Sequence, residues 1–144
     1  MILIRALAAP FIIAAVLLCC CGDFGDVGPI FFGQAPVEIV GGYSLGRPLA
    51  GGLQLYGPGP HAIVGQSVVN IGWDEEFILV EQHPLVGSTG DPRHAYPRWH
   101  IIIVSSGKHF SWRSYDDFLF LRDTVLHVPK TIEMRDAREV YYGD

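Results

Sequence analysis

Cysteine is scarce in this chain and confined to one place. The three cysteines stand side by side as Cys19, Cys20 and Cys21, so none remains to form a disulfide elsewhere.

Basic residues are also few, with ten Lys and Arg against fifteen Asp and Glu and a formal net charge of -5. Nucleic-acid binding uses clustered Lys and Arg, so the composition argues against a nucleic acid as partner.

Several motifs that carry chemistry are missing as well. The six histidines show no HExxH or HxH spacing, and the acidic run Asp74-Glu75-Glu76 lacks the spacing of an EF-type calcium loop. The run 57–60, read GPGP, is not a phosphate loop, because no Lys followed by Ser or Thr comes after it. No motif therefore identifies a cofactor, and none is expected.

Glycine and proline, in contrast, are abundant, at 17 and 10 residues in a chain of 144. This content favours short elements joined by many turns over long helices. The length suits one domain with one modest core. We predict an α+β fold, dominated by an antiparallel sheet of five to seven short strands with one C-terminal helix packed on it.

The strongest strand pattern is 68–82, read VVNIGWDEEFILVEQ. Two apolar runs rich in β-branched and aromatic residues flank the acidic run Asp74-Glu75-Glu76. This pattern predicts a β-hairpin with its turn at 74–76. The run 77–80 is apolar at every position, which indicates a central strand covered on both faces. Its expected partner is the apolar run 99–104, followed by a turn at 105–108 and a strand over 109–112.

The remaining strands are shorter. We expect a first strand over 37–45 that is interrupted at Gly41-Gly42 by a bulge or a close backbone approach, then strands at 53–56 and 62–64. Between 83 and 98 the chain reads as a long loop, and loops of this length in compact domains are often functional. A last short strand is expected at 131–134, while 135–144 is left open between strand, one helical turn and a frayed end.

One helix is predicted over about 115–126. Ser114 and Asp117 have the spacing of a helix N-cap, and Phe118, Leu121 and Val125 recur at helical intervals. Leu119 and Leu126 would widen the same apolar stripe.

The N-terminus holds the most specific signal. A short segment with Arg5 precedes an apolar run that ends at Leu18, directly before the cysteines. This segment resembles a bacterial lipoprotein signal peptide, which implies cleavage and diacylation at Cys21, or alternatively at Cys20 or Cys19. The usual Gly or Ala just before the cysteine is absent here. An uncleaved anchor and an ordinary secretory signal are the two other interpretations.

We divide the chain accordingly into a signal peptide at 1–20, a Gly-rich tether at 21–36 and a single mainly β domain at 37–144. Acyl chains such as palmitate would hold the domain on the extracytoplasmic side of a bilayer, since each buried methylene contributes about 0.8 kcal/mol.

A second resemblance covers 39–134. The order of NIGWDEEFILVEQ, WHIIIV, a Ser-Tyr-Asp-Asp-Phe helix start and a Val-Pro-x-x-Ile ending is similar to a family of small bacterial lipoproteins of unknown function. In that family the aromatic strand often ends in an acidic residue, where this chain has Ser105-Ser106. The resemblance implies fold and location and assigns no catalytic residues.

Histidine, acidic and serine residues could carry chemistry, but each set also has an ordinary structural role. His83, His94 and His100 flank the long loop and could hold zinc in a small hydrolase, but satisfied or solvated histidines are the favoured interpretation. Asp74 and its neighbours are interpreted as a turn. Ser105 or Ser106 with a histidine could suggest a hydrolase triad, yet no G-x-S-x-G surrounds either serine.

Aromatic and Arg residues dominate interface hot spots, so a possible interaction surface is Tyr96, Arg98, Trp112, Arg113 and Tyr115. The competing interpretation is that Trp112 and Tyr115 cover the start of the helix.

The sequence thus favours a lipid-anchored binding or structural module of the cell envelope, with an envelope protein as possible partner. The alternatives are the metal-dependent hydrolase and an inhibitor- or immunity-like protein.

Overall fold

The computed structural model describes residues 34–49, 51–65, 67–83 and 96–143. Within these ranges the chain forms nine β-strands in two antiparallel sheets, with short helices near the C-terminus. This confirms the α+β, mainly β fold class, although the strands are more numerous than the five to seven expected and fall in two sheets. The cysteines and His94 lie outside the described residues.

The first sheet is a four-stranded meander in the order β1-β2-β3-β4. Its strands are β1 (Val37–Val40), β2 (Tyr43–Gly46), β3 (Gln54–Tyr56) and β4 (Ala62–Val64). Gly41 and Gly42 form the turn of a hairpin between β1 and β2, so the predicted bulge within one strand is wrong. Their φ angles of 57° and 81° suit a two-residue hairpin turn that glycine forms without strain. The alternative, a close approach of another part of the chain, is confirmed at Gly41, where a Cβ would lie 2.5 Å from Val104 Cγ1.

The second sheet has five strands in the order β8-β7-β6-β5-β9. They are β5 (Val68–Trp73), β6 (Phe77–Gln82), β7 (Arg98–Ile103), β8 (Lys108–Trp112) and β9 (Arg135–Asp136). The predicted hairpin and its pairing with the 99–104 run are confirmed. At the turn, Asp74 Oδ1 accepts hydrogen bonds from the backbone N–H of Glu76 at 2.8 Å and of Phe77 at 2.7 Å.

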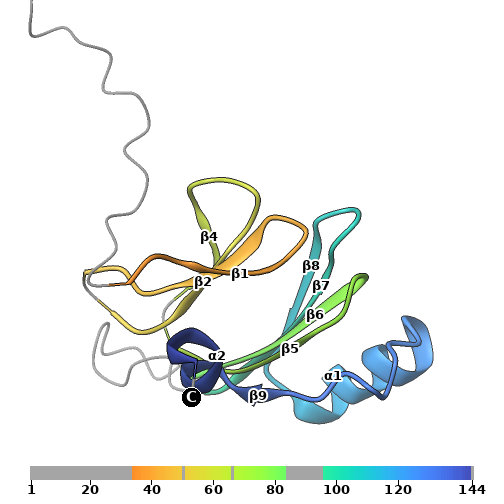
Figure 1. Ribbon diagram of the computed structural model, residues 1–144. Helices are drawn as coiled ribbons and strands as arrows, with labels where there is room; N and C mark the ends of the chain where they lie inside the picture. The colour runs from red at the N-terminus through yellow and green to blue at the C-terminus, as the bar shows by residue number, and fades with distance from the viewer. Residues whose placement is uncertain (1–33, 50, 66, 84–95, 144) are drawn as a thin grey trace, which may run out of the picture.

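Strand β6 lies in the middle of this sheet and is buried on both faces. Ile78 and Val80 join a core shared with the first sheet and α2 (Ala137–Tyr142), which we call the inter-sheet core. Phe77 and Leu79 point the other way, into a second core with Phe118, which we call the helix-side core. Figure 1 shows the first sheet on one side of the five-stranded sheet and α1 on the other side. Side chains of this size contribute about 1.5–3 kcal/mol each when fully buried.

The predicted helix begins as expected. In α1 (Tyr115–Phe120) the Ser114 hydroxyl accepts from Asp117 N–H at 3.3 Å. A π-helical turn, η2 (Leu121–Val125), then follows, with Leu126 N–H donating to Leu121 C=O at 2.9 Å. Because this wider turn shifts the apolar stripe, Val125 is 51% exposed, so its predicted place on the buried stripe is wrong.

The predicted strand at 131–134 is also wrong. The chain there has no regular strand, and the edge strand is β9, two residues long and paired with β5. Ile132 and Met134 instead pack on the helix-side core. Helix α2 follows, which is one of the three possibilities left open for 135–144.

The N-terminal end of the described chain is tied to α2. Gln34 Nε2 donates to the Tyr141 carbonyl at 2.7 Å, and the Tyr141 hydroxyl donates to the Gln34 carbonyl at 2.9 Å. Tyr141 is 2% exposed. The folded domain therefore includes Gln34, three residues before the expected start at Val37.

Candidate functional site

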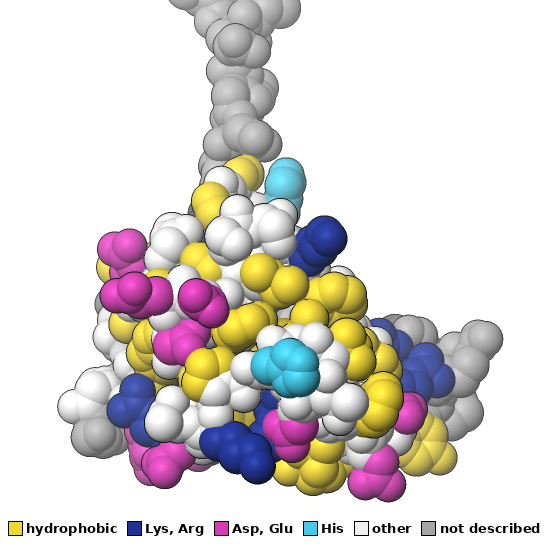
Figure 2. All heavy atoms as spheres, turned by 90° about the vertical axis from the view of Figure 1, so that its right-hand side faces the viewer, with side chains coloured by type: hydrophobic (Ala, Val, Ile, Leu, Met, Phe, Trp, Pro, Cys, Tyr) yellow, Lys and Arg dark blue, Asp and Glu magenta, His cyan; other side chains and the backbone are white. Residues whose placement is uncertain are grey.

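The five residues of the predicted interaction surface lie near one end of the five-stranded sheet. Trp99 on β7 pairs with Trp112 on β8, which places Arg98 and Arg113 at the same end of these strands. The Tyr115 ring centroid is 5.2 Å from that of Trp99. Tyr96 is 62% exposed. The face that carries α1 presents hydrophobic side chains among acidic and basic ones (Figure 2).

Two of these aromatic residues also have structural partners. Trp112 is half-buried, packs on the helix-side core and stacks on Phe110 with ring centroids 5.8 Å apart. The Tyr115 ring lies 5.9 Å from that of Phe118. Both therefore support the start of α1, and the interaction surface stays a prediction.

The histidines expected to flank a metal site have other partners where they are described. His83 Nε2 lies 2.7 Å from Glu81 Oε1. His100 is 4% exposed, and its Nδ1 is 2.9 Å from His109 Nε2 while its Nε2 is 3.1 Å from Gln82 Oε1. Because both ring nitrogens of His100 are in hydrogen bonds, a metal ion would have to break one of them.

The electrostatics of His100 agree with this structural role. Burial is the main cause that lowers the pKa of His100 to about 4, and the charges of His109 and Arg98 contribute in the same direction. The described part of the chain holds no group of three or more His, Cys, Asp or Glu placed to bind a metal ion. His94 and the 84–95 stretch lie outside that part.

The serines named from the sequence occupy a turn. Ser106 Oγ accepts from Lys108 N–H at 3.4 Å, and His109 bonds to His100 and not to either serine. A different serine carries the G-x-S-x-G pattern, which occurs at 42–46 as GYSLG. Ser44 lies inside β2, paired with Glu38 and Tyr56, and not at a sharp strand-to-helix turn. The geometry of a hydrolase nucleophile is therefore missing at Ser44.

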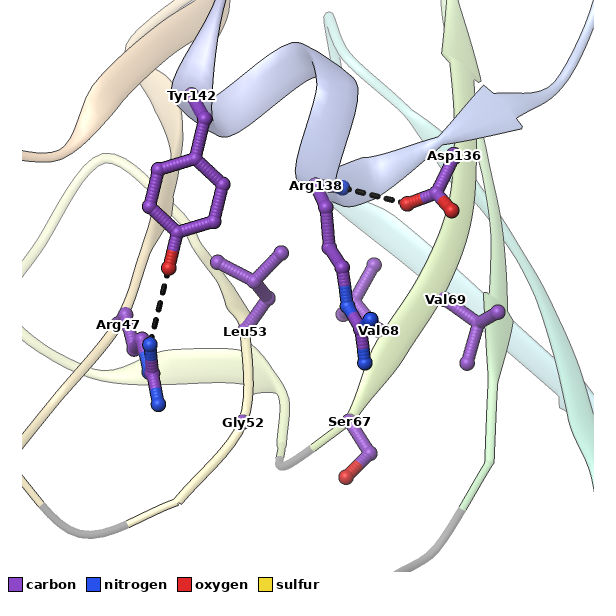
Figure 3. A pocket seen from close by; sticks show the side chains of 9 residues that line it. All are labelled: Arg47, Gly52, Leu53, Ser67, Val68, Val69, Asp136, Arg138 and Tyr142. Carbon is purple, nitrogen blue, oxygen red and sulfur yellow. Dashed lines mark hydrogen bonds between the residues drawn. The ribbon is translucent and has the colours of Figure 1, made fainter.

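The structure instead forms a pocket where the first sheet, β5 and α2 meet. Its volume is about 580 Å³, within the range of about 300–1,000 Å³ typical of small-molecule sites. Figure 3 shows its lining, which comes from four separate stretches of chain: Arg47; Gly52 and Leu53; Ser67, Val68 and Val69; and Asp136, Arg138 and Tyr142.

The polar groups of the pocket are arranged by α2 and by the end of β2. Arg47 Nη1 donates to the Tyr142 hydroxyl at 2.9 Å, a contact between residues far apart in the chain. Asp136 caps α2, its Oδ1 accepting from the Arg138 backbone N–H at 2.7 Å. The Arg138 side chain runs along the pocket between Leu53 and Val68 in the view of Figure 3.

The backbone at Ser67 is the strained part of the pocket. Its φ of 73° lies in the left-handed region, which costs about 1–2 kcal/mol for a residue with a Cβ. Two hydrogen bonds hold it: Val68 N–H donates to Leu53 C=O and His83 N–H donates to Ser67 C=O, both at 2.9 Å. A Cβ on Gly52 would lie 3.0 Å from Ser67 Oγ, so the two segments approach closely here.

Sequence reasoning missed this pocket. Its residues have no shared spacing, and Arg47 read only as the start of a turn. The two arginines lie 91 positions apart in the printed sequence, and only the packing of α2 brings them to one cavity.

Comparison of the chain with family models, with curated proteins and with solved structures gives no match. No helix in the described ranges is long and apolar enough to cross a membrane. The described residues thus form a two-sheet α+β domain with an open pocket where the first sheet, β5 and α2 meet.

Proposed function

We propose that this protein is a lipid-anchored binding module of a bacterial cell envelope, and that its binding site is the pocket between the first sheet, β5 and α2. The lipoprotein-type signal that ends at Cys21 supports the anchor. The pocket supports binding and is the observation that carries the proposal.

Three features of the pocket favour binding over a purely structural role. It has the volume of a small-molecule site. It joins an apolar floor of buried Leu53 and Val68 to a few polar side chains, the usual composition of ligand sites. It also contains a left-handed serine, and strain of this kind is concentrated at functional sites.

The position of the pocket also fits a tethered protein. Tyr142 lines the pocket, and the preceding residue, Tyr141, is bonded to Gln34. The chain between Cys21 and Gln34 can span at most about 45 Å when fully extended. A domain anchored at Cys21 would thus hold the pocket near the membrane surface, within reach of molecules in the envelope.

Binding of an envelope protein is a second candidate. The observation that favours it is the set of exposed apolar residues near α1, where Tyr96 and Phe120 are each 62% exposed and Tyr115 is 49% exposed. Such exposed aromatic groups are typical of interface anchors.

Native mass spectrometry of the protein extracted from membranes in a mild detergent tests the pocket. We expect an adduct of small-molecule mass on the wild type that disappears in Val69→Trp, which places an indole ring in the cavity. Val125→Trp is the matched control, since it adds the same ring at a position that is 51% exposed and outside the pocket. Equal adducts on both variants, or none on the wild type, would contradict the proposal.

A further inference from the structure

We infer that the pocket binds a small organic anion, in which a carboxylate or phosphate group is carried on a compact apolar body. This inference rests on the proposed function, because it names the chemical class of ligand for the same site. Nothing in the sequence motifs points to it, and the juxtaposition of Arg47 and Arg138 carries it.

The pocket carries more positive than negative charge. Two guanidinium groups and one carboxylate, that of Asp136, line it. The whole chain carries a formal charge of -5, so a net positive cavity is not a consequence of a basic composition. In Figure 3 the Asp136 carboxylate lies at the end of the pocket away from Arg47, and one of its oxygens accepts the Arg138 backbone N–H.

Both guanidinium groups have N–H donors that can bind a ligand. Arg138 reaches into the pocket, and among the residues that the structure describes none accepts a hydrogen bond from its side chain. Arg47 is held in place by its bond to the Tyr142 hydroxyl, which leaves its other N–H donors for a ligand. Guanidinium forks bind carboxylate and phosphate oxygens with paired, charge-assisted hydrogen bonds.

An apolar surface lies between the two arginines. Leu53 and Val68 are buried and Val69 is half-buried, and the Tyr142 ring stands at one side of the cavity. An inorganic ion alone would leave this surface wet, whereas an anion with an apolar body would cover it and add the free energy of its burial. The concave shape also fits a discrete molecule better than a flat lipid surface.

Isothermal titration calorimetry of the full chain in a nonionic detergent tests the inference with three probes: phenyl phosphate, benzoate and the uncharged benzyl alcohol. We expect saturable binding of the two anions and weaker binding of the alcohol. Arg138→Gln should weaken binding of both anions at least about tenfold, because it removes a charge-assisted fork. Raising the salt concentration should weaken binding of the anions and leave the alcohol unchanged.

The matched control is Lys130→Gln, which removes the same unit charge from an exposed residue outside the pocket and should change affinity by less than about twofold. Tyr142→Phe keeps the ring but removes the oxygen that orients Arg47, and should produce an intermediate loss. Circular dichroism of each variant verifies the fold.

Equal effects of Arg138→Gln and Lys130→Gln would overturn the inference. If benzyl alcohol then bound as tightly as benzoate, and Val69→Trp abolished both, the pocket would remain a ligand site and only its anion specificity would be lost. Co-sedimentation with phosphatidylglycerol vesicles that depends on Arg47 and Arg138, without any binding of the soluble anions, would likewise overturn it by assigning the arginines to a lipid surface.

Discussion

Individual polar residues in this fold are used mainly to complete backbone and side-chain hydrogen bonding. Asp74 closes the central turn, Ser114 caps α1 and Asp136 caps α2. His100 is the one buried polar side chain of the described core, and both of its ring nitrogens have partners. The arginines of the pocket differ, because Arg138 extends its charge into a cavity.

His100 makes stability depend on pH. Its pKa is about 4 in the folded protein and about 6.5 when unfolded, so between these values the unfolded state binds a proton that the folded state does not. The free energy of unfolding is therefore expected to fall by about 2 kcal/mol from pH 7.5 to pH 4.5 through this residue. Urea unfolding at the two pH values measures it.

The control variant for this effect is His100→Gln, which retains hydrogen-bonding groups without the titration and should show a smaller pH dependence. The exposed His61→Gln should behave as the wild type. An identical pH dependence in wild type and His100→Gln would refute the assignment.

Position 72 requires glycine because the backbone at Glu133 lies close to it. A Cβ at this position would lie 2.5 Å from the Glu133 carbonyl oxygen. Gly72→Ala must push the 131–134 segment off β5 and is expected to lower the free energy of unfolding by about 1–3 kcal/mol. Gly59→Ala is the control, because a Cβ there meets no atom within 4 Å, and it should change stability by less than about 0.5 kcal/mol. Equal melting temperatures of the two variants would count against this packing.

At the scale of elements, the sequence predicted what local pattern controls. The 68–82 hairpin and its pairing with β7 follow from β-branched runs separated by turn residues. The two-residue β9 and the π-helical turn η2 were missed, because β9 depends on a partner far away in the chain and η2 on a change of period within a few residues. The hairpin turn at Gly41-Gly42 is a local signal that was interpreted as an interruption within one strand. The pocket was missed for the same reason as β9, since long-range packing alone assembles its lining.

The two faces of α1 give a direct test of the helix packing. Phe118 is fully buried in the helix-side core and Phe120 is 62% exposed. Phe118→Ala should lower the free energy of unfolding by about 3–5 kcal/mol because it leaves a cavity. Phe120→Ala should change it by less than about 0.5 kcal/mol. Chemical denaturation distinguishes the two, and a large loss for Phe120→Ala would show that its ring is covered by something else.

In the molecule as a whole, the two sheets and α2 form a partly polar pocket next to the helix that holds Gln34. The N-terminal signal predicts that the protein is held at a membrane. Helix α2 links the start of the described domain, at Gln34, to the pocket. The α+β class could be predicted, whereas the separation of β1 to β4 into a sheet of their own, and the pocket beside it, could not.

Metabolic labelling with a fatty acid tests the anchor. We expect label on the wild type and loss of label in Cys21→Ser, because diacylation uses that thiol. Cys20→Ser and Cys19→Ser are the matched variants and should retain label. Label kept in Cys21→Ser and lost in one of the others would move the anchor to that residue, while no label on any form would refute lipidation.

Hydrogen–deuterium exchange of the full chain with and without saturating phenyl phosphate tests whether a small organic anion binds between the first sheet, β5 and α2. Binding slows exchange wherever opening must release the ligand, by a factor that grows with the ligand concentration over its dissociation constant. We expect the backbone amides at 52–53, 67–69 and 136–142 to show most of the protection. Protection confined to 96–115, or none at any position, would contradict it.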